Sequence, residues 1–295
     1  MNRRRFIQNS TLLSIGSLSS MYSRAATIND VGPIGIQLWS VRHAMTKDSM
    51  GTLKSLAEIG YDDVELAGYS EGKFYGMEPL EFKKVLDDLG IMTQSGHTKT
   101  GVMNPEEKNT MINNWEACIR DAAIVGNNSL VLGWIAEEER TDLDSYKRVC
   151  DLLNKCGELS KSYGIQMAYH NHDFEFIDFD GVVAYDYLLQ NTDPDLVKFE
   201  MDHYWVKKGG ANSIDLIDAH PGRFPYWHVK DMDDTTERFF TEVGTGVIDY
   251  KTIFHKRDTS GMKYFYVEQD EFRKGIQPLS SVKQSHDYLE HLNLG

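Results

Sequence analysis

The stretch Gly164-Ile165-Gln166-Met167-Ala168-Tyr169-His170-Asn171-His172 decides the fold, because it joins the end of a helix to a buried strand and finishes in reactive side chains. The amphipathic run before it, 143–163, predicts a helix, and Gly164 is the residue type that most often ends one. The apolar run after Gly164 predicts a strand. This order of elements is typical of the units that build parallel sheets.

The same unit recurs along the rest of the chain. Glycines 60, 90, 126 and 261 also end predicted helices just before predicted strands. The predicted strands are 34–41, 63–66, 91–96, 129–133, 165–171, 197–202, 226–230 and 263–269. The predicted helices are 49–59, 79–89, 105–125, 143–163, 182–190, 213–219, 250–257 and 279–292. Eight strands alternating with eight helices predict a single (β/α)8 TIM barrel over residues 27–295. The alternative, a doubly wound open sheet, is disfavoured because no Gly-rich loop follows the first strand.

The first 26 residues have the pattern of an export signal. Arg3-Arg4-Arg5-Phe6-Ile7 fits a twin-arginine motif, the run 11–18 is apolar but too short to span a bilayer, and Ser23-Arg24-Ala25 offers a cleavage site. We therefore expect a twin-arginine-type export signal at 1–26 and a periplasmic or exported protein. The alternative is a disordered basic tail or an anchor helix.

Composition limits the classes of partner. The chain is 41% hydrophobic and 26% charged, with a net charge of −14, which becomes −18 when the four arginines of the signal are removed. A nucleic-acid binder needs a basic surface, and an anionic membrane also repels this charge, so neither is expected as a partner. The three cysteines, at 118, 150 and 156, lie in predicted helices and are expected to be reduced and buried.

Reactive residues gather where the predicted strands end. In a TIM barrel, the carboxyl ends of the strands form the mouth of the active site. The residues at those ends are Gln37, Trp39, Glu65, His97, Trp134, His170, Asn171, His172, Glu200, Asp202, His228, Lys230 and Glu268. Four of the chain's 10 histidines fall at these few positions. This placement predicts a catalytic site rather than scattered core histidines.

Four of these residues have the character of metal ligands. His170, Asp202, His228 and Glu268 end four successive strands, so their side chains are expected to converge. Imidazole and carboxylate ligands without thiolate suit one divalent ion such as Mn, Zn, Co or Mg. Such an ion polarises a carbonyl and eases removal of the neighbouring proton. Taken singly, each histidine has an alternative reading as a satisfied core residue.

The remaining strand-end residues have candidate roles in substrate binding and proton transfer. Lys230 faces the same side of its strand as His228 and is expected to bind a substrate oxyanion or to pair with an acid such as Glu200. Trp39 and Trp134 are expected to stack on a sugar ring, or else to pack under the loops. His97 is a candidate donor to a substrate hydroxyl. Glu65 and Asn171 are also assigned to substrate binding, while Glu268, His172 and Lys230 are the catalytic candidates.

The chain resembles the xylose-isomerase-like superfamily, which includes tagatose 3-epimerases, hydroxypyruvate isomerase, inosose dehydratase and endonuclease IV enzymes. The motifs that carry the resemblance are Gly35-Ile36-Gln37-Leu38-Trp39-Ser40, Gly60-Tyr61-Asp62-Asp63-Val64-Glu65, Tyr169-His170-Asn171-His172-Asp173-Phe174-Glu175, Met201-Asp202-His203-Tyr204-Trp205, His228-Val229-Lys230-Asp231 and Val267-Glu268-Gln269-Asp270. The resemblance implies a barrel, a divalent metal and ligands on strands 5 to 8. Those ligands carry over onto Asp202, His228 and Glu268.

The fifth strand departs from the superfamily's pattern. The epimerases carry there a Glu that binds the metal and removes a proton, and this chain carries His170, as inosose dehydratase-like members do. Inversion of a carbon centre needs a base on each face, so a chain with one carboxylate fewer fits isomerisation or elimination better. His170 or His172 can replace the missing base, and Glu175 is a weaker candidate ligand from the following loop.

The sequence therefore predicts a metal-dependent isomerase or epimerase that removes a proton alpha to the carbonyl of a small free sugar or keto-sugar. The alternative is a lyase, dehydratase or hydrolase acting on 3-keto-glycosides or inosose-like substrates. An endonuclease IV-like phosphodiesterase conflicts with the acidic charge. A non-catalytic sugar-binding barrel would not need the ligand set. A homo-oligomer is compatible with the sequence. The segment Val243-Gly244-Thr245-Gly246 is expected to be a loop rather than a phosphate-binding site.

Overall fold

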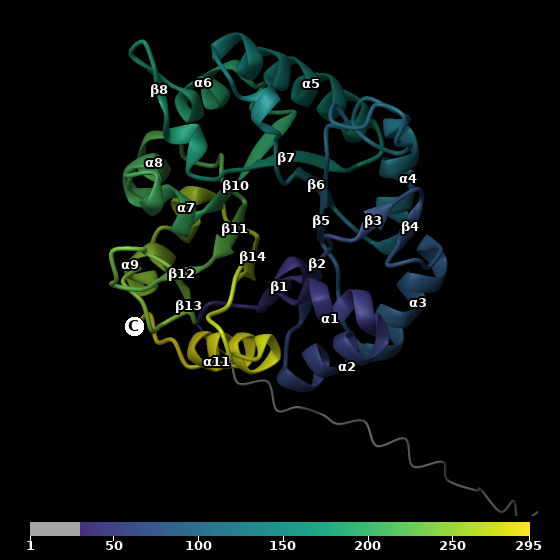
Figure 1. Cartoon of the computed structure of the whole chain (residues 1–295), viewed down its shortest axis with the longest axis vertical. Helices are drawn as coiled ribbons and strands as arrows, with labels where there is room; N and C mark the ends of the chain where they lie inside the picture. The colour runs from purple at the N-terminus through teal and green to yellow at the C-terminus, as the bar shows by residue number, and fades with distance from the viewer. Residues whose placement is uncertain (1–29) are drawn as a thin grey trace, which may run out of the picture.

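Eight parallel strands form the centre of the structure, a computed structural model that describes residues 30–295 (Figure 1). Their order is β2-β1-β14-β11-β10-β7-β6-β5, and the bridges Asp63↔Met92 and Leu66↔Gly96 join β2 to β5 and close the ring. The strands are β1 (Gly35–Gln37), β2 (Asp63–Glu65), β5 (Ser95–Thr98), β6 (Ser129–Leu132), β7 (Gln166–His170), β10 (Val197–Asp202), β11 (Tyr226–Val229) and β14 (Tyr264–Val267). The predicted TIM barrel is therefore confirmed.

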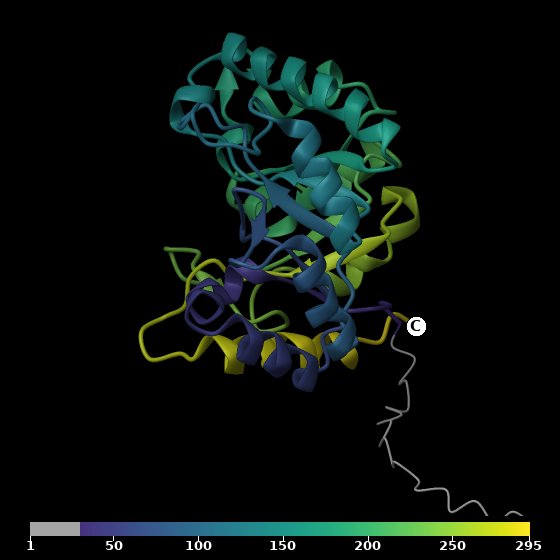
Figure 2. The same ribbon diagram turned by 90° about the vertical axis from the view of Figure 1, so that its right-hand side faces the viewer.

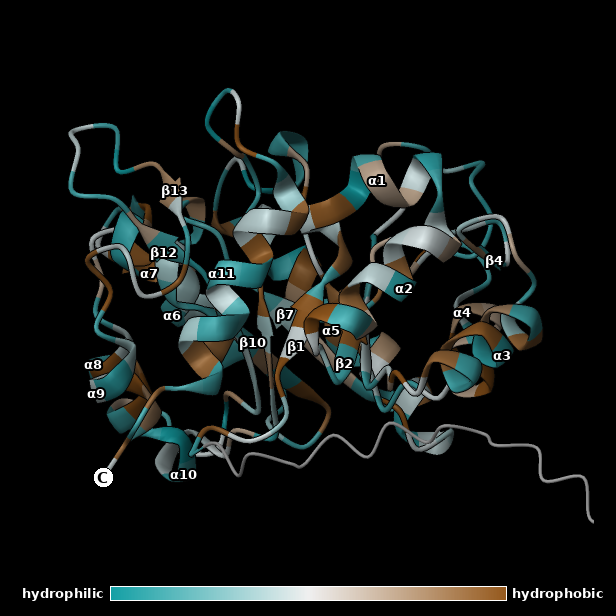
Figure 3. Ribbon diagram, turned by 90° about the horizontal axis from the view of Figure 1, so that it is seen from below, coloured by the Kyte–Doolittle hydropathy of each residue, from teal (hydrophilic) through white to brown (hydrophobic). Residues whose placement is uncertain are grey.

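Helices surround this ring on the outside (Figures 1 and 2). They carry both apolar and polar bands, as expected for helices with one face on the strands and one in water (Figure 3). The main ones are α1 (Arg42–Lys47), α2 (Ser49–Ile59), α3 (Pro79–Leu89), α4 (Trp115–Val125), α5 (Leu143–Ser162), α6 (Ala184–Asn191), α7 (His203–Lys208), α8 (Ser213–Ala219), α9 (Tyr250–Phe254), α10 (Arg257–Ser260) and α11 (Pro278–Glu290). The bounds of α2, α3 and α8 are those predicted.

Several predicted helices are wrong in extent. The helix expected over 182–190 begins at Ala184, because residues 182 and 183 form a short strand, and the helix expected over 279–292 ends at Glu290. The helix expected over 105–125 begins only at Trp115, because the residues before it form turns in which Asn109 and Asn114 adopt left-handed backbone angles of +60° and +63°. The helix expected over 250–257 is divided into α9 and α10, with residues 255 and 256 between them. Proline at 105 suggested a helix start that the following asparagines do not allow.

The first and third strands also differ from the prediction. The strand expected over 34–41 ends at Gln37, whose side chain accepts a hydrogen bond from Trp39 N and starts the 3-10 helix Leu38–Val41. The strand expected over 91–96 lies instead at 95–98, so His97 belongs to the strand itself rather than to a turn. Three short hairpins were not predicted: β3 (Tyr69–Ser70) with β4 (Lys73–Phe74), β8 (Asp178–Phe179) with β9 (Val182–Val183), and β12 (Asp231–Met232) with β13 (Phe240–Thr241).

The apolar core lies between the strands and the helices, and includes all three cysteines, which are buried with free thiols. None of the helices within residues 30–295 is long and apolar enough to cross a membrane. The export signal predicted at 1–26 lies outside the described residues.

Candidate active site

A cavity of about 480 Å³ opens at the carboxyl ends of the barrel strands. This volume lies in the range of sites for small molecules. Trp39 and Trp134 line it and remain 45% and 46% exposed, so their rings are available to a ligand. The other lining residues are Ala67, Tyr69, His97, Thr98, Lys99, Asn109, Gly133, His170, His172, Glu268 and Asp270.

The four predicted metal ligands lie together below the cavity. One ligand atom from each of His170, Asp202, His228 and Glu268 lies within 4.8 Å of the others, and all four side chains are buried. His228 Nδ1 is 2.7 Å from Glu268 Oε2, and His170 Nε2 is 3.9 Å from Asp202 Oδ2. The structure thus brings together the residues that the sequence selected from four strand ends. Whether they hold an ion stays a prediction.

Helix α7 helps to orient one of these ligands. Asp202 ends β10 and caps α7, because its Oδ1 accepts a hydrogen bond from Trp205 N at 2.9 Å. Its backbone N donates to Asn171 Oδ1 at 3.0 Å. The second oxygen, Asp202 Oδ2, is thereby directed toward the cluster. Asn171, predicted to bind substrate, is buried beside this backbone and is absent from the cavity lining.

Lys230 lies among carboxylates rather than at the cavity wall. Its Nζ is 2.9 Å from Asp202 Oδ2, 2.7 Å from Glu268 Oε2 and 2.6 Å from Asp270 Oδ2, and the side chain is fully buried. The expected ion pair is present, but its partners are these three acids and not Glu200, whose carboxylate contacts histidines instead. A buried ammonium in this position neutralises the cluster and holds Glu268 and Asp270 in place.

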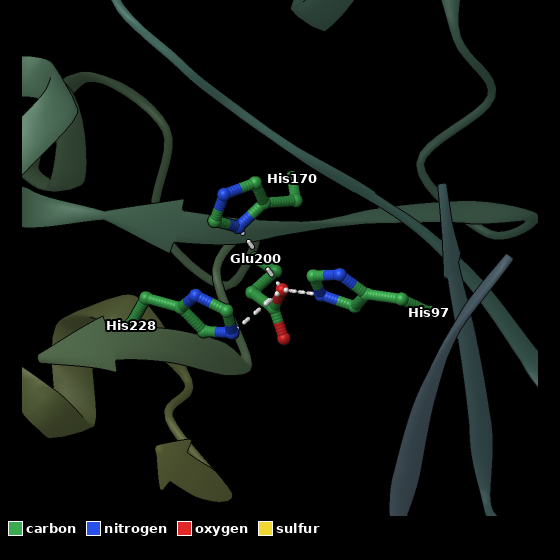
Figure 4. Close-up of side chains that lie close together, drawn as sticks. All are labelled: His97, His170, Glu200 and His228. Carbon is green, nitrogen blue, oxygen red and sulfur yellow. Dashed lines mark hydrogen bonds and ion pairs between the residues drawn. The ribbon is translucent and has the colours of Figure 1, made fainter. Parts of the chain in front are cut away.

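A second group of side chains lies next to the first and was only partly anticipated. Glu200 Oε2 is within 2.8–3.1 Å of nitrogens from His97, His170 and His228 (Figure 4). Glu65, predicted to bind substrate, is instead fully buried, and its Oε2 is 2.6 Å from His228 Nε2. The signal for Glu200 was present in the sequence, because residues two apart on a strand share a face and Asp202 was already selected.

His172 and Asp270 are the cavity-lining residues best suited to move protons. His172 stacks on Phe174 with ring centroids 5.1 Å apart, and its Nδ1 has no hydrogen-bond partner among the described residues. Glu175, the weaker candidate ligand, does not join the cluster: it is buried and accepts hydrogen bonds from Tyr169 Oη and His172 N. It therefore fixes the backbone from which His172 projects.

Burial and neighbouring charges set the protonation of these groups. Burial lowers the pKa of His172 to about 3, and Lys230 adds to the effect, so the ring is neutral near pH 7. Burial raises the pKa of Asp270 to about 6 although Lys230 opposes the shift. Burial alone would also raise the pKa of Glu268, but Lys230 and His228 outweigh it and hold that pKa well below its ordinary range. Burial would lower the pKa of His228, yet Glu200 and Glu268 raise it well above 6.5.

The donor set fits a divalent cation. Glu65, Glu200, Asp202, Glu268 and Asp270 bring five carboxylates to this region of the barrel, and Lys230 pairs with the last three of them. Glu65 Oε1 and Glu200 Oε1 make no hydrogen bond within the described part of the chain. Buried negative charge and unsatisfied oxygens of this kind are stabilised by a bound cation. The nitrogen and oxygen donors of the first cluster suit Mn, Zn, Co or Mg.

The glycine-containing segment after β13 has a structural role. Asp231, next to Lys230, accepts hydrogen bonds from the backbone N–H groups of Gly244 and Gly246 at 2.9 and 3.0 Å and of Ile248 at 3.1 Å. A Cβ at Gly246 would lie 2.2 Å from Met232 O, so only glycine fits there. The segment is a loop, as predicted, and it secures the end of β11.

Fold and site together define a TIM-barrel protein with a buried cluster of histidines and carboxylates at the mouth of the barrel. A sequence profile of the xylose isomerase-like TIM barrel family matches residues 53–292, and the chain belongs to this family. Members of this superfamily include sugar-modifying enzymes, namely isomerases, epimerases and dehydratases.

Similar proteins carry related names. An inosose dehydratase from Geobacillus kaustophilus is 25% identical over 273 residues, 81% of this chain and 86% of that protein. The chain spans about half the length of other inosose dehydratases that it matches, 54% for the one from Lactiplantibacillus plantarum. A sugar phosphate isomerase/epimerase from Parabacteroides distasonis is 28% identical with a TM-score of 0.78, covering 89% of this chain and 99% of that one. The IolI protein, whose structure contains a zinc atom, shares the fold at 14% identity with a TM-score of 0.63, over 86% of this chain and 95% of that one.

Proposed function

We propose that this protein is a divalent-metal-dependent enzyme that removes the proton alpha to the carbonyl of a small free sugar or keto-sugar and eliminates water from the neighbouring carbon. His170, Asp202, His228 and Glu268 would hold the ion. The observation that carries the proposal is that two of these ligands, His170 and Glu268, line one cavity together with two groups able to transfer protons, His172 and Asp270. The other two ligands, Asp202 and His228, lie in the same cluster. The similarity to inosose dehydratases supports the same reaction class.

The bound ion would polarise the carbonyl and so acidify the adjacent C–H bond. His172, a neutral ring at the cavity wall, is the group that accepts the proton from the alpha carbon. The C–O bond of the hydroxyl on the next carbon then breaks, and the carboxyl proton of Asp270 joins the departing oxygen to give water. An α,β-unsaturated ketone remains. A pKa of about 6 allows Asp270 to gain and lose a proton near neutrality.

The cavity walls support a free sugar rather than a phosphorylated one. Trp39 and Trp134 offer aromatic faces of the kind that stack on sugar rings. Lys99 is the only lysine among the lining residues, which include no arginine, and Lys99 is already paired with Glu107. A phosphate group usually requires arginines or several N–H donors.

A second candidate function is isomerisation, in which the proton returns to the neighbouring carbon instead of a hydroxyl leaving. The similarity to the Parabacteroides distasonis isomerase/epimerase favours it. Epimerisation is less well supported, because the end of β7 carries His170 where epimerases carry a second carboxylate base.

The test is a panel of free sugars and keto-sugars incubated in D2O with the metal-loaded protein. Elimination is expected to give an ultraviolet-absorbing unsaturated ketone and a product lighter by one water. Deuterium at a single carbon with no loss of mass as water would instead indicate isomerisation. Metal-free protein that turns over substrate at the native rate would contradict the ion-dependent mechanism.

We also propose that residues 1–26 direct export by the twin-arginine route. Replacement of both Arg3 and Arg4 by Lys keeps the positive charge and is expected to retain the full-length chain in the cytoplasm. The measurement is the distribution of the protein between periplasmic and cytoplasmic fractions. Unchanged export of this variant would contradict the assignment.

A further inference from the structure

Below the candidate ion ligands, one carboxylate oxygen contacts three imidazole rings. Glu200 Oε2 is 2.8 Å from His97 Nε2, 3.1 Å from His170 Nδ1 and 3.1 Å from His228 Nε2 (Figure 4). These histidines come from β5, β7 and β11, and Glu200 itself lies on β10. Glu200 is fully buried, so water does not compete for these contacts.

Glu65 completes this lower layer from the opposite side of the barrel. Its Oε2 is 2.6 Å from His228 Nε2 and accepts a hydrogen bond from Gln37 Nε2 at 2.7 Å. The His228 ring is therefore held on its Nε2 side by two carboxylates. An ionised carboxylate can only accept hydrogen bonds, so each ring nitrogen that faces Glu65 or Glu200 carries a proton.

The opposite nitrogens of two of these rings face the candidate ion ligands. His228 Nδ1 lies 2.7 Å from Glu268 Oε2 and 3.9 Å from Asp202 Oδ2. His170 Nε2 lies 3.9 Å from Asp202 Oδ2. Each ring thus connects two layers, one of carboxylates that hold a proton and one of ligands suited to a cation.

We propose that Glu200, with Glu65 beside it, is a positioning residue that keeps the proton on His170 Nδ1 and on His228 Nε2, and so presents His170 Nε2 and His228 Nδ1 to the ion. The inference rests on the proposed function, because it names the residues that prepare two of its ligands. A carboxylate that fixes the proton of a ligating imidazole also fixes the orientation of the ring and strengthens its donor nitrogen.

The arrangement disfavours a second ion in the lower layer. His97, His170, Glu200 and His228 are close enough to hold one. If both layers were occupied, however, His170 and His228 would each have to bind metal through both nitrogens and lose both protons. With one ion, held by the upper layer, the ring nitrogens of His97, His170 and His228 that face Glu200 keep their protons and donate to it. All three imidazoles can then be neutral.

The experiment measures Zn²⁺ affinity and the proton positions of the histidines in the full chain. The variant is Glu200→Gln, which keeps the shape and removes the charge. The matched control is Glu139→Gln, a buried carboxylate that contacts Thr100 and Ala136 and none of the four ligands. Competition with a chelator should show Zn²⁺ binding weakened by about 10- to 100-fold in Glu200→Gln and little changed in the control.

Nitrogen-15 NMR of the zinc-loaded protein gives the second readout, which a loss of stability alone would not produce. The wild type is expected to retain protons on His170 Nδ1 and His228 Nε2, and Glu200→Gln is expected to lose the fixed proton on His170. The inference is overturned by native affinity and proton positions in Glu200→Gln, by zinc bound to the opposite nitrogens, or by two ions per wild-type chain.

The outcomes also separate this inference from the proposed reaction. A wild type with the expected affinity and proton positions that turns over no sugar supports the inference and contradicts the proposed reaction alone. A wild type that binds no Zn²⁺ contradicts the ion of the proposed function and overturns the inference with it.

Discussion

At the scale of single residues, His172 and Asp270 allow the proposed roles in proton transfer and in ion binding to be tested separately. Neither belongs to the four candidate ligands, so His172→Gln and Asp270→Asn should each lower turnover by about 10²- to 10⁴-fold, the usual contribution of a proton-transfer group, with ion content unchanged. The measurement is the rate on the substrate found in the D2O panel, together with elemental analysis.

Glu268→Gln provides the contrast to those two variants. Its carboxylate touches both His228 and Lys230, so its loss should lower ion content as well as turnover. If His172→Gln keeps native turnover, His172 is not the base, and Glu268, the other base predicted from the sequence, would have that role.

Glu175 makes stability depend on pH in a direction opposite to most carboxylates. Burial raises its pKa to about 7, while the unfolded chain keeps a value near 4.5. The folded protein therefore binds this proton more tightly, so the contribution of Glu175 to stability is most favourable below pH 4.5 and is lost as pH rises through about 7. Glu175→Gln should remove this fall and gain roughly 1–3 kcal/mol relative to wild type between pH 5 and pH 8.

Urea unfolding at both pH values measures this effect. Equal pH dependence in wild type and Glu175→Gln would mean that Glu175 stays ionised in the folded state, satisfied by Tyr169 and His172 alone.

The sequence predicted which side chains meet in the cluster because a barrel collects the ends of its strands at one mouth. His170, Asp202, His228 and Glu268 could be selected from strand ends without knowing any distance. Asn171 could have been excluded, because successive residues of a strand point to opposite faces and His170 was already selected. The contacts of Glu200 depend on how deep each ring enters the barrel, which strand order alone does not give.

At the scale of elements, the end of β6 shapes the cavity through a missing side chain. A Cβ at Gly133 would lie 2.3 Å from His97 Nδ1, so an alanine there must displace the imidazole. Gly133→Ala is expected to lower both stability and turnover. In the double variant with His97→Ala, stability should return because the clash is gone, while turnover should stay low. Thermal unfolding and turnover of the three variants measure this, and additive losses of stability would contradict the clash.

The loop after β13 depends on one carboxylate in a similar way. Asp231 accepts backbone hydrogen bonds from Gly244, Gly246 and Ile248, and its replacement by Ala leaves these donors unsatisfied. We expect Asp231→Ala to destabilise the protein by about 1–3 kcal/mol or more, measured by urea unfolding. Native stability would show that water replaces the carboxylate without loss.

Helices were predictable where local signals agree with packing. For α3, a proline at its first position and Gly90 after its end mark both bounds, and the prediction was correct. For α4, Pro105 gave a similar start signal, but the turns at Asn109 and Asn114 delay the helix to Trp115. The hairpin β12–β13 escaped prediction because its strands are two residues long and leave little periodicity.

At the scale of the whole molecule, the barrel gathers more negative charge at its floor than its own lysine can balance. In the metal-free protein, protons on histidines balance part of this excess negative charge. Burial would lower the pKa of His97, but Glu65 and Glu200 overcome this effect and raise it to about 10. The carboxylates around His228 likewise raise its pKa well above 6.5. An ion that binds His228 Nδ1 must replace the proton on that nitrogen. Ion binding and proton release are therefore linked.

Release of one proton per ion means that Zn²⁺ affinity should rise by about tenfold for each unit of pH below the pKa of His228. At a free Zn²⁺ concentration of 100 times the Kd, the ion should stabilise the fold by about 2.7 kcal/mol. Removal of the ion by a chelator should therefore lower the midpoint of thermal unfolding. The decrease should be larger at pH 8 than at pH 6, because the ion binds more tightly at pH 8. Calorimetry in buffers of different ionisation enthalpy counts the protons that are released when the ion binds.

The control is Asp202→Asn, in which the ion-dependent stabilisation should be largely lost. Affinity that is independent of pH would mean that the ion does not bind His228 Nδ1, and a ligand set without this histidine would have to replace the one proposed.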